Sequence, residues 1–130
     1  MGLDVCNNLF GNFHVNWAGT RWFRIWCLDH SLPEPFIGWE SGLNDGDRCS
    51  LGPRRKHNKS AKAWCAALEK RFPDIAALGN PLLTNPPGDF HRYLYPKDSL
   101  QKEEWERRAV AGWYAILQHG IEHGDTLEYW

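Results

Sequence analysis

The residues from His119 to Asp125 read HGIEHGD. Two histidines four residues apart lie on one face of an α-helix, imidazole nitrogen is a common zinc ligand, and a nearby carboxylate can activate a zinc-bound water. The order H-x-x-E-H is that of the inverted zincins. This motif predicts one function for the chain: a metal-dependent hydrolase with His119 and His123 as metal ligands and Glu122 as the catalytic carboxylate.

The residues around the motif favour a simpler interpretation. Gly120 and Gly124 flank its second half, and glycine after an amphipathic run is a common C-terminal stop of a helix. Histidine in the last helical turn is also stabilised by the helix dipole, without any metal. We therefore expect a helix terminus here, with no catalytic residue, no metal and no cofactor, and keep the hydrolase as the alternative.

The four cysteines show no metal-site spacing. They stand at positions 6, 27, 49 and 65, without a C-x-x-C pair, whereas structural zinc sites usually place ligands two to four residues apart. We expect free thiols, mostly buried as small apolar groups. Cys49 and His57 are the candidate thiol and imidazole pair for a cysteine enzyme, but their spacing has no specificity.

A stretch from Arg48 to Lys62 carries positive charge and no acid. Its basic residues are Arg48, Arg54, Arg55, Lys56, Lys59 and Lys62, which leaves nine basic and 16 acidic residues in the rest of the chain. Guanidinium and ammonium groups beside a helix start bind phosphate or carboxylate. The sequence therefore predicts a docking site for an anionic partner, either an acidic protein patch or a nucleotide. The net negative remainder argues against duplex nucleic acid.

Tryptophan is unusually frequent, with 8 residues in 130. So many indoles exceed what a small core needs, so we expect some of them at the surface, where they can anchor a partner. Trp22, Arg24 and Trp26 alternate as on one face of a strand, with the guanidinium stacked on indole. These three residues are predicted to join the contact surface. An oligomeric subunit that buries its Trp-rich face is a second alternative to binding.

The elements that position these residues follow from periodicity and turn signals. Residues 9–28 show two aromatic and β-branched runs around AGT, which predict an N-terminal β-hairpin. Apolar residues at helical spacing predict two main helices, about 59–72 and 99–120, the first starting at Asn58 or Ser60. Short strands are expected at 36–40, 90–95 and 126–130, with one helical turn before Gly79. This order predicts a single α+β domain over residues 1–130 with a mostly antiparallel sheet.

The chain has no apolar run of the roughly 18 residues that a membrane span requires. The first ten residues, MGLDVCNNLF, have neither the basic region nor the apolar region of a secretory signal. We therefore expect a cytoplasmic protein that does not contact membranes.

The opening Met1-Gly2-Leu3-Asp4 resembles the start of small uncharacterised proteins of bacteria and their phages. Where those proteins usually continue with a tyrosine, this chain has VCNN. The resemblance implies a phage- or prophage-type accessory protein that acts by binding and inhibiting another protein. It carries no catalytic residue. Together with the basic segment and the frequent tryptophans, this resemblance leads us to expect a small interaction protein rather than an enzyme. The oligomeric state of the protein stays open.

Overall fold

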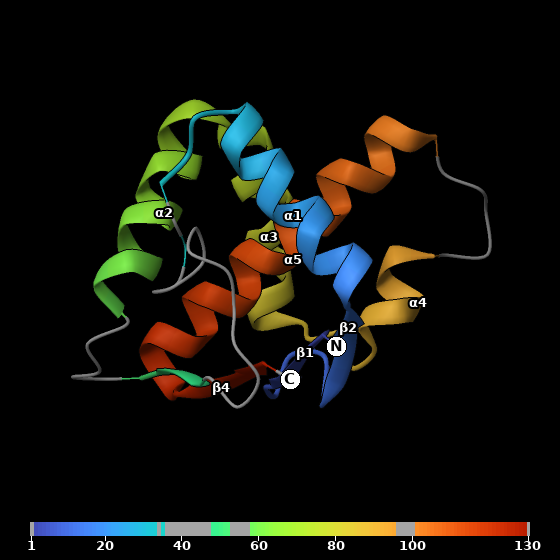
Figure 1. Ribbon diagram of the computed structural model, residues 1–130, viewed down its shortest axis with the longest axis vertical. Coiled ribbons are helices and arrows are strands. Elements are labelled where there is room, and N and C mark those ends of the chain that lie inside the picture. Colours follow the sequence, from blue (N-terminus) through green and yellow to red (C-terminus); the bar gives the residue numbers. More distant parts are fainter. Residues whose placement is uncertain (1, 34, 36–47, 53–57, 96–100, 130) are drawn as a thin grey trace.

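The computed structural model describes residues 2–33, 35, 48–52, 58–95 and 101–129. Its elements in chain order are β1 (Gly2–Cys6), β2 (Phe13–Asn16), α1 (Trp17–Asp29), β3 (Arg48–Leu51), α2 (Asn58–Arg71), α3 (Pro73–Thr84), α4 (Phe90–Leu94), α5 (Lys102–His123) and β4 (Asp125–Tyr129). In Figure 1 the strands lie along the lower edge of the molecule and most of the helix mass lies above them. The α+β class is confirmed, but helix outweighs strand in the described chain.

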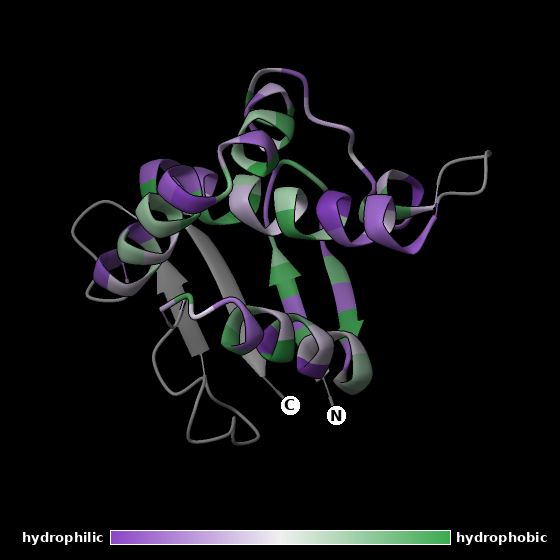
Figure 2. Ribbon diagram, turned by 90° about the horizontal axis from the view of Figure 1, so that it is seen from above, coloured by the Kyte–Doolittle hydropathy of each residue, from purple (hydrophilic) through white to green (hydrophobic). Residues whose placement is uncertain are grey.

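The sheet has the order β2-β1-β4-β3, and every neighbouring pair in it is antiparallel. Side chains alternate along the strands: Leu3 and Val5 are fully buried, whereas Asp4 is half-buried and Cys6 is exposed. Figure 2 shows the same alternation as bands of opposite hydropathy along β1 and β2. One face of these strands therefore packs on the helices and the other carries polar groups.

Helix α5 is the centre of the core. Its residues are buried without interruption from Ala109 to Leu117, which is the pattern of a helix surrounded by other elements. Helix α3 packs against it most extensively. This contact needs Gly79, because a Cβ at that position would lie 2.8 Å from the Ala111 carbonyl oxygen and 2.8 Å from Cδ1 of Tyr114.

The predicted hairpin within residues 9–28 is wrong in its second strand. A hairpin does form at the N-terminus, but from β1 and β2, and the AGT segment is the first turn of α1. Asn16 caps this helix, because its side-chain oxygen accepts a hydrogen bond from the Gly19 N–H at 2.8 Å. Phe23, Trp26 and Cys27 then reach the core at helical spacing. The cap and this burial pattern are both those of a helix, not of the strand that the aromatic residues predicted.

The other predicted elements have mixed outcomes. The two main helices are confirmed as α2 and α5, and the last strand is confirmed as β4. The strand predicted at 90–95 is wrong: this segment is α4, capped by Asp89, whose side chain accepts from the Arg92 N–H. The single turn predicted before Gly79 is the start of α3, which continues past Pro81. The strand predicted at 36–40 lies outside the described residues.

Candidate functional site

A buried asparagine joins two points within the predicted basic segment, on either side of residues 53–57. Asn58 is the first residue of α2, and its side-chain oxygen accepts from the Gly52 N–H at 3.1 Å while its side-chain amide donates to the Gly52 carbonyl. Both residues are buried. We call this pair of hydrogen bonds the Asn58–Gly52 clasp. It holds the first residue of α2 against the residue that follows β3.

Three of the predicted binding residues, Arg54, Arg55 and Lys56, lie in that segment and outside the described residues. Lys59 and Lys62 follow on α2, and both are exposed. They share one face of the helix with Ala63, Ala66 and Lys70, which are also exposed. We call these five residues the α2 basic face. Because alanine is small, a partner can approach the helix between the lysines.

The side of α2 opposite to this face is fully apolar and packs into the core. Trp64 and Leu68 are completely buried, with Ala61 and Cys65 beside them. The only acid of α2, Glu69, is held by other residues: its carboxylate accepts from the Tyr114 hydroxyl at 2.6 Å and from the Gln118 amide at 3.0 Å. The helix therefore presents more positive than negative charge to solvent.

Arg48 lies away from the α2 basic face. It is the first residue of β3 and stands four residues before Gly52, so it lies about 13 Å along the strand from the clasp. The sheet register places Arg48 opposite Glu128, Glu128 opposite Asp4, and Asp4 opposite His14. These four residues form one row across the whole sheet. The structure thus separates Arg48 from Lys59 and Lys62.

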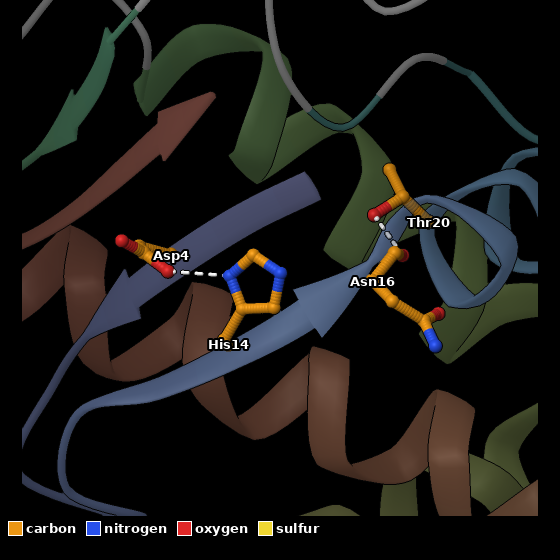
Figure 3. A network of polar contacts seen from close by, with 4 residues as sticks. All are labelled: Asp4, His14, Asn16 and Thr20. Atoms are coloured by element: carbon orange, nitrogen blue, oxygen red, sulfur yellow. Dashed lines mark hydrogen bonds and ion pairs between the residues drawn. The ribbon is translucent and has the colours of Figure 1, made fainter. Parts of the chain in front are cut away.

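The row contains a polar pair that the sequence did not reveal. His14 and Asp4 are joined by a contact of 2.6 Å between Nδ1 and Oδ1, as Figure 3 shows, with side-chain exposures of 46% and 38%. In the same view the Thr20 hydroxyl donates to the Asn16 carbonyl and closes the first turn of α1. Because the pair is solvent-exposed, it adds about 1 kcal/mol or less to stability.

The predicted aromatic contact residues lie on helix α1 and not on a strand. Trp26 is only 8% exposed and stacks on His30, with ring centroids 4.2 Å apart. Trp22 is half-buried and packs edge-on against Trp105 at 4.9 Å. Arg24, which lies between these two tryptophans in the sequence, is half-buried. Trp26 therefore contributes to the core, and Trp22 presents only part of its ring to solvent.

The HGIEH motif forms the last turn of α5. The rings of His119 and His123 lie 4.7 Å apart between centroids, and Nε2 of His123 is 3.7 Å from Oε2 of Glu122. Gly124 ends the helix with φ of 88°, and its N–H donates to the Gly120 carbonyl. Among the residues that the structure describes, no three His, Cys, Asp or Glu side chains gather as metal ligands. A catalytic zinc site normally uses three.

Two buried thiols are chemically inert near neutral pH. Burial raises the pKa of Cys27 to about 12, although a contact with Trp64 lowers it in part. Burial raises the pKa of Cys65 to about 12 as well, and the Glu69 carboxylate adds to the rise. Cys6 is exposed, so the expectation of burial holds for two of these three thiols. The predicted pair of Cys49 and His57 cannot be placed, because His57 lies outside the described residues.

Comparisons with known proteins place the chain in no family. No protein-family model matches the sequence, and no match was found among curated proteins or among solved structures. Within the described residues, no helix combines the length and apolar character needed to cross a membrane.

Proposed function

We propose that this protein is a small interaction protein that docks an acidic patch of another protein. The contact surface consists of the α2 basic face and the adjoining residues Arg54, Arg55 and Lys56. The observation that carries the proposal is the α2 basic face, where Lys59, Lys62 and Lys70 are all exposed on one side of the helix. A contact surface on a packed helix loses less conformational entropy on binding than a mobile one.

The spacing of the lysines favours an extended partner. Lys59 and Lys70 are eleven residues apart on one helix, which corresponds to about 16 Å along its axis. That length exceeds a single phosphate or carboxylate group and suits a row of acidic side chains. A nucleotide would use only the N-terminal end of the surface. The resemblance of the first four residues to phage-type proteins supports an accessory protein that inhibits its partner by occupying such a patch.

A matched pair of double variants tests the surface. Lys59→Ala with Lys62→Ala removes two charges from the α2 basic face, and Arg92→Ala with Lys102→Ala removes two exposed charges elsewhere. The probe is a fluorescent poly-glutamate peptide, titrated at low and moderate salt. We expect the first variant to bind at least about tenfold more weakly, a loss of about 1.4 kcal/mol, and the second to bind almost as the parent does.

The remaining part of the surface is tested by Arg54→Ala, Arg55→Ala and Lys56→Ala together, which should also reduce binding by an order of magnitude or more. Titrations with ATP and with a short DNA duplex separate the partner classes. Tighter binding of ATP than of poly-glutamate would replace the acidic protein patch by a nucleotide. Equal losses in the two double variants would show that only net charge matters and would overturn the proposed surface.

A further inference from the structure

The α2 basic face has the residue spacing of a helix-packing seam. Its residues at intervals of four, three and four positions are Lys59, Ala63, Ala66 and Lys70. Residues at these intervals form a line along a helix that a second helix can follow, as in a coiled coil. All four are exposed, and Figure 1 shows α2 at the left edge of the molecule with no described helix beyond it. We call these four residues the α2 seam, and Lys62 lies beside it.

The α2 seam is small at its centre and positively charged at its ends. Ala63 and Ala66 have no side-chain atom beyond Cβ, so the axis of a partner helix can come within about 8 Å of the axis of α2 at this level. Within the described part of the chain, Lys59, Lys62 and Lys70 have no ion-pair partner. Their ammonium groups therefore attract a partner that carries carboxylates near both ends of the contact.

We infer that the partner of this surface is an acidic amphipathic α-helix of another protein, an inference that rests on the docking role proposed for α2. The partner helix packs two large apolar side chains against Ala63 and Ala66 and presents a carboxylate to Lys59 and another to Lys70. The intervals read the same in both directions, so the partner needs the order acid, apolar, apolar, acid at the same spacing.

An extended peptide fits the α2 seam less well than a helix does. It covers the roughly 16 Å between Lys59 and Lys70 with only about five residues, and its side chains point alternately toward the seam and away from it. It therefore brings fewer side chains to the four seam residues. A helix has the same rise per residue as α2, so each of its four contact residues lies level with one residue of the seam.

Two acidic peptides of equal charge and composition test the class of partner. One is an alanine-rich peptide of about 20 residues, long enough to be helical in water, with glutamate, leucine, leucine and glutamate at the seam spacing. The other has the same sequence with two central alanines as D-enantiomers, which break the helix and leave the charge unchanged. We expect the helical peptide to bind at least about tenfold more tightly. Equal binding of the two peptides would overturn the inference.

The alanine positions give a second test, in which the charge of the protein does not change. Ala63→Gln with Ala66→Gln lengthens two side chains at the centre of the α2 seam, whereas Ala18→Gln with Ala77→Gln changes two exposed alanines on α1 and α3. We expect the first variant to bind the helical peptide at least about tenfold more weakly and poly-glutamate within about twofold of the parent. The second variant should bind both probes as the parent does. If the first variant keeps full affinity for the helical peptide, the partner does not pack on the alanines and the inference fails.

The helical partner and the docking surface fail in different ways. If Lys59→Ala with Lys62→Ala weakens poly-glutamate and both peptides to the same degree, and the parent shows no preference for the helical peptide, the α2 basic face remains a docking surface and the helical partner is wrong. If the parent binds none of the three probes, the docking surface is overturned and the helical partner with it.

Discussion

Replacing Asn58 by alanine should destabilise the protein far more than a change at the start of a helix normally does. The substitution removes both hydrogen bonds of the Asn58–Gly52 clasp and leaves the buried N–H and carbonyl of Gly52 without these partners. An unsatisfied buried polar group costs about 1 to 3 kcal/mol. Alanine recovers a few tenths of a kcal/mol through its higher helix propensity. For the two groups the expected loss is therefore about 2 to 5 kcal/mol, or roughly 10 to 20 °C in Tm.

Urea unfolding, followed by tryptophan fluorescence and by circular dichroism, measures this loss. Lys59→Ala is the matched control, because its side chain is exposed on the same helical turn, and it should change the free energy of unfolding by about 0.5 kcal/mol or less. Asn58→Ala should also weaken poly-glutamate binding, although it removes no charge. If Asn58→Ala costs no more than Lys59→Ala, the clasp does not hold this part of the chain and the reasoning fails.

Two further predictions concern the core. Gly79→Ala should destabilise the protein by about 1 to 2 kcal/mol in urea unfolding. The added Cβ makes close contacts with Ala111 and Tyr114, and their cost outweighs the roughly 1 kcal/mol gained in helix propensity. A variant that is more stable than the parent would contradict this packing. The free energy of unfolding should also fall as the pH rises above about 9, by about 1.4 kcal/mol per pH unit for each buried thiol. Cysteine in the unfolded chain loses its proton in this range, whereas Cys27 and Cys65 in the folded protein have pKa values of about 12 and keep theirs. The double variant Cys27→Ala with Cys65→Ala should lose this part of the slope.

The elements that could be predicted are those with a long periodic signal and a clear stop. Helix α5 has both, because its apolar spacing runs over several turns and ends at Gly124. Helix α1 lacks such a signal, because alternating aromatic residues fit a strand as well as a helix. Two features of the structure favour the helix: Asn16 caps its first turn, and Phe23, Trp26 and Cys27 are buried at helical spacing. The second depends on tertiary packing, which the local pattern does not specify.

The residue types of the candidate site could be predicted from the sequence, but their arrangement in space could not. Lys59 and Lys62 are exposed as a binding surface requires, since lysines on an amphipathic helix lie opposite its apolar side. The role of Asn58 was hidden, because an asparagine at a helix start usually caps its own helix and here it reaches back to Gly52. The contact of His14 with Asp4 depends on the β1–β2 register, which no local pattern in the sequence specifies.

The pairing of β1 with β4 has a consequence for how the protein is made. Leu3 is paired with Tyr129, and β4 is the only strand in the described sheet that connects β3 to β1. On a ribosome β4 emerges after every other described element, so β1 and β3 cannot pair with their shared neighbour until α2 to α5 have been synthesised. The pairing of Leu3 with Tyr129 closes almost the whole described chain into one loop, which is slow compared with forming the helices. Because α5, the centre of the core, ends at His123 and β4 begins at Asp125, the helical core and the sheet receive their last described elements almost together.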